Sequence, residues 1–490
     1  MRLGPLNLAE VQGAFVDGAS RAAASAETFV DVDPADGEQL ALVAKGGPED
    51  IQRAVAAARE SFEGAWAKVR PAERSRLLLS LASAIRAVSE DLARLESMDV
   101  GKPISQARAD VEVAARYFEF YGGVADKLTG STIPLGPGLL DLTVKEPVGV
   151  SGQIIPFNYP IQNTGRGAAP ALAAGCTVVL KPSPEAPLSA LAVAALAVEV
   201  GIPRGALNVV PGFSDAGAAL ASDPGIDQVT FTGSVPTGIA VAQAAAQNVV
   251  PAVLELGGKS PSVFFADADF ELALAGVRSS IYANAGQTCS AGTRLLVENS
   301  PEGKDFVGQL VASVGALTLG RGLDDPDVGP LVSSRQLERV EGYLELARSQ
   351  RATFLVGGRR PADPELRGGY FLEPTVLSDV DLDSRLAQEE IFGPVLTVFT
   401  FDVLSEAAVL ANNSSYGLSA SVWTRDIDKA LDLATKIKSG QVYVNAYAVG
   451  GGVELPFGGY KRSGWGREKG LEALHEYTQV KNVCIGYRVP

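Results

Sequence analysis

The chain has 490 residues, of which 46% are hydrophobic, and it contains 53 glycines and 29 prolines. One hydrophobic core seldom serves a chain of this length, so we expect two or three globular domains and little disorder. The net charge of −15, without any cluster of basic residues, argues against nucleic acid or an anionic membrane as a partner. No apolar stretch is long enough to cross a bilayer, and we expect a cytoplasmic protein.

Cysteine and histidine usage restricts the possible chemistry. Cys176, Cys289 and Cys484 are too few and too scattered for a disulfide framework or a zinc site, which predicts a reducing compartment and no metal. The single histidine, His475, lies beside Glu472 and Glu476 on a helix that we expect to be exposed. Cysteine and carboxylates must therefore carry the covalent and acid–base chemistry.

The first third of the chain predicts short strands followed by helices. Residues 28–44 favour two strands around the turn Asp33–Gly37, because proline and glycine preset the turn angles. A helix is predicted from Pro48, which is followed by acidic residues suited to a first turn. Apolar periodicity indicates further helix over 72–98 and 104–125. A glycine- and proline-rich stretch at 130–138 interrupts the pattern.

From residue 144 onward, short strands alternate with helices. We predict strands at 149–155, 177–180, 206–210 and 228–231, with helices between them, and a second alternating stretch at 261–457. Such alternation indicates parallel sheets with helices on both faces, that is, an α/β fold with two domains and a cleft between them. Ligands of such sheets bind beyond the carboxyl ends of the strands, where Asn158, Lys181 and Ser234 lie.

Two sequence features carry the chemistry. Cys289 lies in Asn284-Ala-Gly-Gln-Thr-Cys-Ser-Ala-Gly292, and Glu255 lies in Leu254-Glu-Leu-Gly-Gly-Lys259. A thiol nucleophile and a carboxylate base can together form and hydrolyse an acyl-enzyme. Taken alone, the cysteine also fits buried packing and the glutamate a turn cap, so neither residue decides the function by itself.

Seven short motifs, in chain order, resemble those of the aldehyde dehydrogenase superfamily, and the resemblance extends from about residue 15 to 485. Its fold is α/β, with two Rossmann-like parallel-sheet domains and a small β oligomerisation element. The resemblance implies a cofactor-binding domain at 1–128 and 148–257, a catalytic domain at 258–460 and an oligomerisation element at 129–147 and 475–490. The motifs are Ile155–Pro160, Lys181–Ser183, Phe231–Ser234 with Gly238, Leu254–Lys259, Gly286–Cys289, and the pair Glu390–Pro394 and Pro456–Gly459.

The same resemblance assigns roles to individual residues. Cys289 attacks the aldehyde as a thiolate, Asn158 and a backbone N–H hold the oxyanion, and Glu255 activates the water that releases the acid. A small-molecule aldehyde is the implied partner, together with further copies of the chain in a homodimer or homotetramer. The implied cofactor-binding residues are Ile154, Ile155, Pro156, Phe157, Lys181, Ser183, Pro184, Gly217, Phe231, Gly233, Ser234, Gly238, Leu256, Glu390 and Phe392.

One departure from the family pattern concerns the cofactor. NAD-dependent members commonly carry a glutamate three residues after the lysine, and this chain has Pro184 there. Loss of that carboxylate removes a repulsion toward the 2′-phosphate of NADP. NADP use is therefore open, and we predict NAD as the cofactor from its frequency in the family.

A second departure concerns the substrate. Many relatives have an aromatic residue and a lysine where this chain has Arg166-Gly167, and succinate-semialdehyde dehydrogenases resemble it in the arginine. Their second arginine, however, corresponds to Ala283. By resemblance, aromatic side chains line the aldehyde tunnel, which predicts an apolar or aromatic aldehyde as substrate. Three alternatives remain: a semialdehyde whose carboxylate binds Arg166, a CoA-acylating enzyme, and a catalytically inactive structural relative. The candidate walls are Tyr117, Tyr121, Tyr159, Trp423 and Phe457, with Arg166 beside them.

Overall fold

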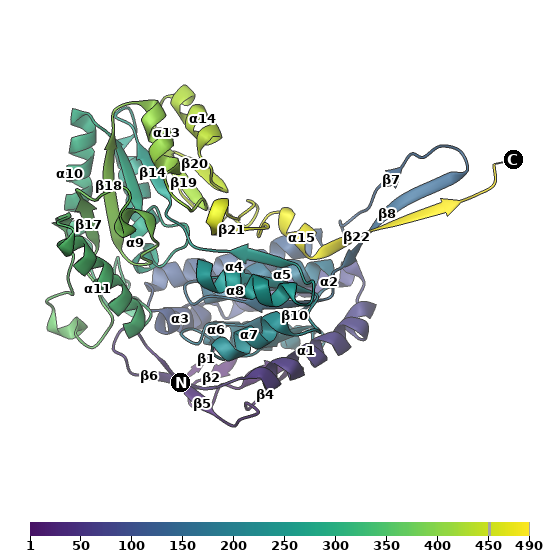
Figure 1. The fold of residues 1–490 in the computed structure, drawn as a ribbon. Helices are drawn as coiled ribbons and strands as arrows, with labels where there is room; N and C mark the ends of the chain where they lie inside the picture. The colour runs from purple at the N-terminus through teal and green to yellow at the C-terminus, as the bar shows by residue number, and fades with distance from the viewer. Residues whose placement is uncertain (449–451, 490) are drawn as a thin grey trace.

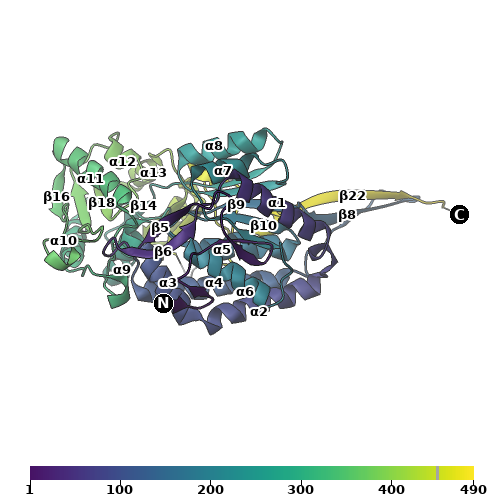
Figure 2. The same ribbon diagram turned by 90° about the horizontal axis from the view of Figure 1, so that it is seen from below.

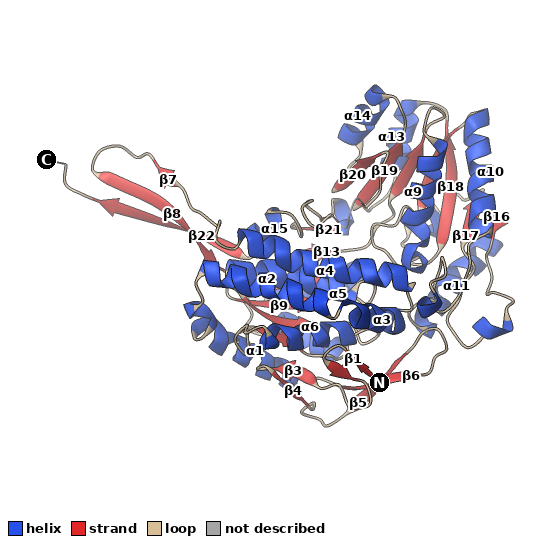
Figure 3. Cartoon of the chain, turned by 180° about the vertical axis from the view of Figure 1, so that it is seen from behind, coloured by secondary structure: helices blue, strands red, loops and turns tan. Residues whose placement is uncertain are grey.

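The computed structural model describes residues 1–448 and 452–489 and confirms the predicted α/β class. Two sheets, each with helices on both faces, form two adjoining bodies, and an arm of antiparallel strands projects from one of them (Figures 1 and 3). Small pairs of strands accompany the first body. They are β1 (Arg2–Leu3) with β2 (Leu6–Asn7), and β5 (Thr28–Val32) with β6 (Gln39–Ala44).

Four helices follow the first strands. Helix α1 begins where Pro48 occupies the first turn and the Asp50 carboxylate accepts the Gly47 N–H at 3.0 Å. The helical pattern predicted over 72–98 is divided into two helices, because the backbone of Val88 leaves helical angles. The helices are α1 (Pro48–Glu63), α2 (Pro71–Ala87), α3 (Ser89–Val100) and α4 (Ile104–Val124).

The first large sheet has the strand order β21-β13-β12-β9-β10-β11-β3-β4, and its five central strands are parallel. The chain runs outward from β9 in both directions, so the carboxyl end of β9 is a topological switch point, where α/β sheets bind ligands. The strands are β3 (Ala14–Val16), β4 (Ala19–Arg21), β9 (Val150–Ile154), β10 (Thr177–Lys181), β11 (Leu207–Val209), β12 (Gln228–Thr232), β13 (Ala252–Glu255) and β21 (Gly464–Trp465), and the helices are α5 (Pro160–Ala174), α6 (Leu188–Glu199), α7 (Ser214–Ser222) and α8 (Val235–Ala246).

The second sheet has the order β16-β17-β18-β15-β14-β19-β20 and is parallel except for β16. The loop that carries Cys289 joins α9 to β15. Figure 2 shows the second body beside the first, with the arm of antiparallel strands projecting at the opposite side. The strands are β14 (Pro261–Phe264), β15 (Arg294–Glu298), β16 (Thr353–Val356), β17 (Thr375–Ser378), β18 (Val395–Phe401), β19 (Ser419–Trp423) and β20 (Gln441–Val444), and the helices are α9 (Phe270–Tyr282), α10 (Pro301–Gly315), α11 (Ser334–Ser349), α12 (Arg385–Gln388), α13 (Leu404–Asn412) and α14 (Ile427–Lys436).

The projecting arm consists of β7 (Thr132–Ile133), β8 (Leu139–Pro147) and β22 (Thr478–Gly486), with α15 (Glu472–Glu476) at its base. Strands β8 and β22 pair antiparallel over their full lengths, from Thr478 opposite Pro147 to Gly486 opposite Leu139. In Figure 1 the arm extends well away from both bodies. His475, on α15, is exposed, as the sequence predicts.

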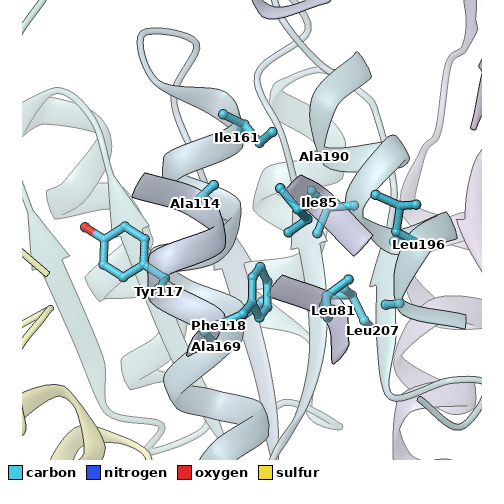
Figure 4. Packing of buried hydrophobic residues seen from close by; sticks show 14 of the residues in the cluster. Leu81, Ile85, Ala114, Tyr117, Phe118, Ile161, Ala169, Ala190, Leu196 and Leu207 are labelled. Atoms are coloured by element: carbon cyan, nitrogen blue, oxygen red, sulfur yellow. The ribbon is translucent and has the colours of Figure 1, made fainter. Parts of the chain in front are cut away.

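Helices α2, α4, α5 and α6 enclose a large apolar core on one face of the first sheet. Leu81, Ile85, Phe118 and Ile161 belong to this core and are labelled in Figure 4. This packing fixes α5, and with it the segment that precedes α5 and carries Asn158.

Candidate active site

Two cavities meet at Cys289. One, of about 160 Å³, is lined by Asn158, Glu255, Glu390 and Phe392 together with Cys289. The other, of about 400 Å³, is lined by Tyr159, Arg166 and Phe457, and again by Cys289. A thiol between two cavities can meet one ligand on each side, so we distinguish a cofactor side and an aldehyde side.

The loop before Cys289 is held in an unusual backbone conformation. Asn284 and Ala285 have φ values of 49° and 53°, a left-handed region that costs energy for residues with a side chain. The hydroxyls of the two residues flanking the cysteine are also tied down. Thr288 Oγ1 lies 2.8 Å from the hydroxyl of Tyr159, and Ser290 Oγ lies 3.1 Å from that of Tyr447.

Burial raises the pKa of the Cys289 thiol to about 11, although the charges of Arg166 and Lys469 act to lower it. The thiol is therefore largely protonated at neutral pH in this structure. The lowered pKa that a thiolate nucleophile requires has to come from a ligand charge that arrives with the cofactor.

Asn158 is buried and anchored from both ends. Its side-chain Nδ2 donates to the backbone carbonyl of Gln287 at 2.9 Å. The backbone carbonyl of Asn158 accepts from Asn284 Nδ2 at 2.8 Å. That carbonyl also accepts from the ammonium of Lys102 at 2.9 Å. The amide that faces the cavity with Cys289 is therefore fixed before any substrate arrives.

Lys102 is itself fully enclosed. It is only 1% exposed, forms an ion pair with Asp110 and lies 3.6 Å from Glu96. Its ammonium also lies 4.2 Å from the centre of the Tyr159 ring. One buried cation thus contacts both Asn158 and the tyrosine that holds Thr288. The sequence offered no signal for this arrangement, because Lys102 is distant from every catalytic motif.

Glu255, the last residue of β13, is 1% exposed, and neither of its carboxyl oxygens has a hydrogen-bond partner among the described residues. Burial, reinforced by the charge of Glu468, raises its pKa well above the ordinary glutamate value. A carboxyl group whose pKa is raised and that lines the cavity beside Cys289 can act as a general base once it ionises.

On the cofactor side, a cavity of about 500 Å³ continues from the Glu255 cavity over the carboxyl ends of β9, β10 and β12. The two cavities share Pro156, Phe157, Gly233 and Ser234. Most of the predicted cofactor residues line this larger space. They are Ile154, Ile155, Pro156, Phe157, Lys181, Ser183, Gly217, Phe231, Gly233 and Ser234.

The glycines on this side allow the backbone to lie close to neighbouring side chains. A side chain at Gly257 would meet Glu390 Oε2 at 2.4 Å, and one at Gly233 would meet the Phe231 ring at 2.5 Å. Glu390 accepts the Gly258 N–H at 3.0 Å and, with Phe392, lines the cavity that contains Cys289. An elongated, largely apolar space with a carboxylate at one end and a lysine at the other fits a dinucleotide.

Three predicted cofactor residues do not line either cofactor-side cavity. Pro184 lines neither cavity. Gly238 and Leu256 pack against each other, since a Cβ atom at Gly238 would lie 2.5 Å from Leu256 Cδ2. Gly238 thus allows α8 to approach the end of β13, which is a packing role.

Glu185, the residue after Pro184, carries a carboxylate on this side. It lines the 500 Å³ cavity with Lys181, accepts a hydrogen bond from Ser183 and pairs with Arg335 at 2.7 Å. The motif spacing alone gave no carboxylate at this point, whereas the turn after β10 brings the next acidic residue to the cavity wall.

Comparison with known proteins agrees with this geometry. Residues 21–483 match the model of the aldehyde dehydrogenase family. The betaine aldehyde dehydrogenase of Bacillus subtilis (strain 168) is 42% identical over 478 residues, which cover 96% of this chain and 97% of that protein. The chain belongs to the aldehyde dehydrogenase family. The resemblance in the motifs, the fold and the enzyme class predicted from them are therefore confirmed.

Solved structures of the family superpose closely. A putative aldehyde dehydrogenase from Burkholderia cenocepacia has a TM-score of 0.95 at 48% identity and covers 97% of this chain, with 99% of that chain covered. An NAD⁺ complex of an aldehyde dehydrogenase from Bacillus cereus has a TM-score of 0.95 at 43% identity, with 98% of each chain covered.

The aldehyde-side cavity of this aldehyde dehydrogenase differs from the predicted apolar tunnel. Tyr159, Arg166 and Phe457 line it, but Tyr117, Tyr121 and Trp423 do not. Tyr117 and Tyr121 belong to α4 and are buried in the core, and the Tyr121 hydroxyl donates to the carbonyl of Gly470 at 2.9 Å. Figure 4 shows Tyr117 at the edge of this apolar cluster, with its hydroxyl pointing away from the other labelled residues.

Trp423 also lies in a core and not on the wall of the aldehyde-side cavity. It is the last residue of β19, it is 1% exposed, and its Nε1 donates to Ser262 Oγ at 2.9 Å within the second body. Of the five large aromatic residues predicted as tunnel walls, these three are core residues instead. Polar residues that the sequence did not single out complete the cavity, among them Gln162, Asn163, Ser279, Ser280, Thr288, Ser290, Tyr447 and Lys469.

Arg166 is engaged by the protein. Its Nε lies 2.6 Å from Glu468 Oε2, and its guanidinium donates to Thr232 Oγ1 at 2.8 Å. Both charged side chains are at least nine-tenths buried. Glu468 and Lys469 come from the loop after β21, far from Arg166 in sequence, so spacing gave no hint of this contact.

Two kinds of feature are missing from the described residues. In the part of the chain that the structure describes, no helix is both long and apolar enough to cross a membrane. Within 1–448 and 452–489, no group of three or more histidine, cysteine, aspartate or glutamate side chains is arranged to hold a metal ion.

Proposed function

We propose that this enzyme oxidises an aldehyde to a carboxylic acid with NAD, with Cys289 as nucleophile, Asn158 as oxyanion donor and Glu255 as general base. The observation that carries the proposal is the place of Cys289, on the wall of both the aldehyde-side cavity and the cavity that leads to the dinucleotide space.

The chain's own groups perform the steps as follows. Once its proton has been lost, the Cys289 thiolate bonds to the aldehyde carbon, and the carbonyl oxygen takes the negative charge. One Asn158 Nδ2–H donates to the Gln287 carbonyl, and the second would stabilise this oxyanion. A nicotinamide held by Glu390 and Phe392 would supply the acceptor for the hydride that leaves this carbon. Glu255 takes a proton from water, the resulting hydroxide attacks the thioester carbon, and the thiolate leaves as the acid forms.

Residues on the cofactor side have separate tasks in this proposal. Lys181 and Glu185 hold the adenosine ribose, and Glu390 and Phe392 hold the nicotinamide end. The Glu185 carboxylate would repel the 2′-phosphate of NADP, which supports NAD as the cofactor. The NAD⁺ complex of the Bacillus cereus relative supports the same choice.

A CoA-acylating reaction is the alternative within the family. It needs no base for hydrolysis, whereas Glu255 lies buried in the cavity beside Cys289. The arm of β7, β8 and β22, which exposes Val480 and Ile485, supports a homodimer or homotetramer, since an unpartnered strand surface invites another subunit. The three cysteines are unpaired, which supports a reducing cytoplasmic location.

The test follows absorbance of NADH with butanal as substrate, together with mass spectrometry of acid-quenched turnover mixtures. We expect a covalent acyl group on the peptide containing Cys289. Cys289→Ala should lower kcat by about 10⁴-fold or more, because the covalent route is removed. Cys484→Ala, which changes an exposed cysteine on the arm, is the matched control and should retain wild-type kcat. An active Cys289→Ala enzyme would contradict the proposal.

A further inference from the structure

A small cavity lies in the second body at the amino ends of three neighbouring strands. It is lined by Pro261, Arg294 and Ser419, the residues at which β14, β15 and β19 begin, and by the lysine just before them, Lys259. Its volume is about 10 Å³, which is about the space that one water-sized particle takes. It shares no lining residue with the cavities around Cys289 or with the dinucleotide space, so no proposed catalytic step uses it.

Four polar side chains of this lining have no hydrogen-bond partner among the described residues. They are the ammonium of Lys259 and the hydroxyls of Ser260, Ser419 and Ser439, all on residues that are at most 9% exposed. A buried donor without a partner destabilises the folded state, and a charged donor does so most. Four such groups gathered on one cavity indicate an occupant that accepts hydrogen bonds.

The charges around the cavity favour a negative occupant. Among the described residues that line it, Lys259 and Arg294 are buried cations, and no aspartate or glutamate is present. The Arg294 guanidinium is held by neutral groups alone, the backbone carbonyls of Lys259, Leu410, Ala411 and Asn413. Burial lowers the pKa of Lys259 to about 7, and the charge of Arg294 adds to this effect. Water would compensate neither cation, whereas an anion would stabilise both.

We propose that this cavity, which we call the Lys259 cavity, binds one small anion, of which chloride is the physiological example. The ammonium of Lys259 and the three serine hydroxyls would contact the ion, and Arg294 would add positive charge. The volume excludes phosphate, carboxylates and nucleotides as occupants. Lys438, which also lines the cavity, is exposed and gives an ion a route from solvent.

Backbone contacts join the Lys259 cavity to the segment between the two bodies. Arg294 Nε donates to the Lys259 carbonyl at 2.9 Å, and the N–H of the preceding residue, Gly258, donates to Glu390 at 3.0 Å. A Cβ atom at Gly258 would lie 2.2 Å from the backbone carbonyl oxygen of Cys289, so this segment also packs on the loop of the nucleophile. We therefore expect the bound anion to stabilise the folded enzyme.

The direct test is a crystal structure of the full-length enzyme grown in sodium bromide, because bromide is close to chloride in size and gives an anomalous signal. We expect an anomalous peak in contact with Lys259 Nζ in the wild type and no peak at this place in Lys259→Met. Lys304→Met, at an exposed site on α10, is the matched control and should keep the peak. Electron density for water without an anomalous signal in the wild type would overturn the inference.

The melting temperature provides a second test. At equal ionic strength, sodium chloride should raise the melting temperature of the wild type by about 2 °C over sodium gluconate, whose anion is too large for the cavity. The difference is taken within each protein, so a change in intrinsic stability cancels. It should vanish in Lys259→Met, fall by about half in Ser419→Ala and persist in Lys304→Met.

A difference of wild-type size in Lys259→Met would show that chloride acts elsewhere and would also overturn the inference. If Lys259→Met does not fold, the wild-type crystal and Ser419→Ala still decide, because Ser419→Ala removes one hydroxyl and keeps the ammonium. Neither test depends on the proposed aldehyde oxidation.

Discussion

The two sides of Cys289 are built in different ways. The cofactor side consists of segments that follow parallel strands: Ile155–Asn158 after β9, Ser183 and Glu185 after β10, and Gly233 with Ser234 after β12. The aldehyde side gathers α4, α5, α9 and the loops around Phe457 and Lys469, which are far apart in sequence. A sheet fixes the relative positions of its strand ends, whereas helices and loops can exchange side chains without changing the fold.

Because the two sides are built differently, we expect variants on each side to change the kinetics in different ways. A change on the cofactor side or behind Asn158 should alter the turnover of every aldehyde by the same factor, because it acts on the common steps. A change on the aldehyde side should alter the ratio between aldehydes. The kinetics of each variant are therefore measured with two aldehydes of equal chain length, the neutral butanal and 4-oxobutanoate, which carries a carboxylate.

The largest effect is expected for Glu255→Gln. The amide cannot take a proton from water, so kcat should fall by about 10²- to 10⁴-fold with both aldehydes, and the acyl-enzyme should accumulate. In the wild type, Glu255 is a base only when ionised, and its pKa is raised, so kcat should rise with pH as the group ionises and fall as pH drops below that pKa. The variant should lose this dependence. Equal stopped-flow hydrolysis rates in both proteins would show that another group is the base.

A smaller loss is expected for Lys102→Met, which tests the support behind Asn158. Without the ammonium, the Asn158 carbonyl and the Tyr159 ring lose a shared contact, and displacement of the oxyanion donor should lower kcat by about 10- to 100-fold with both aldehydes, with KM for NAD unchanged. The single change also leaves Asp110 buried without its ion pair, which costs stability.

Glu96, the other buried carboxyl group beside Lys102, loses its ion pair as well. The triple variant Lys102→Met with Asp110→Asn and Glu96→Gln separates these effects. It removes both uncompensated carboxylates, so the melting temperature should recover while kcat stays low. If kcat recovers together with the melting temperature, Lys102 contributes to stability only and does not position Asn158.

The smallest effect is expected at the far end of the cofactor side. Glu185→Gln removes the carboxylate beside Ser183 and Lys181 and releases Arg335, so the ratio of kcat/KM for NADP over NAD should rise by about tenfold. Glu199→Gln, at an exposed position near the end of α6, should leave the ratio unchanged. A ratio that moves with the choice of aldehyde would break the separation between the two sides.

Much of the fold and of the chemistry was accessible from the sequence. The alternation of strands and helices predicted both parallel sheets, and the motifs predicted Cys289, Glu255 and Asn158, which the structure brings to one cavity. Local sequence suffices for Glu255 at the end of β13 and for Asn158 after β9, because the ends of parallel strands lie at one edge of the sheet. Cys289 lies in the loop before β15, and only its motif indicated its role.

Three predictions failed where side-chain direction mattered. Tyr117, Tyr121 and Trp423 have the composition of tunnel walls, but the faces of α4 and β19 that carry them turn into the cores. The motif spacing at Pro184 also did not indicate that the next residue, Glu185, lines the cofactor-side cavity. Neither direction follows from composition, because burial depends on which face the neighbouring elements cover.

The sequence by itself determined the family, the α/β architecture and the reacting groups, since each is encoded in a contiguous segment. Only the tertiary structure decided the environment of those groups: the ammonium of Lys102 behind Asn158, the pairing of Glu468 with Arg166, and the place of Lys469 on the aldehyde side. These contacts join segments separated by many tens of residues, and their energies depend on burial and distance, which no local pattern specifies.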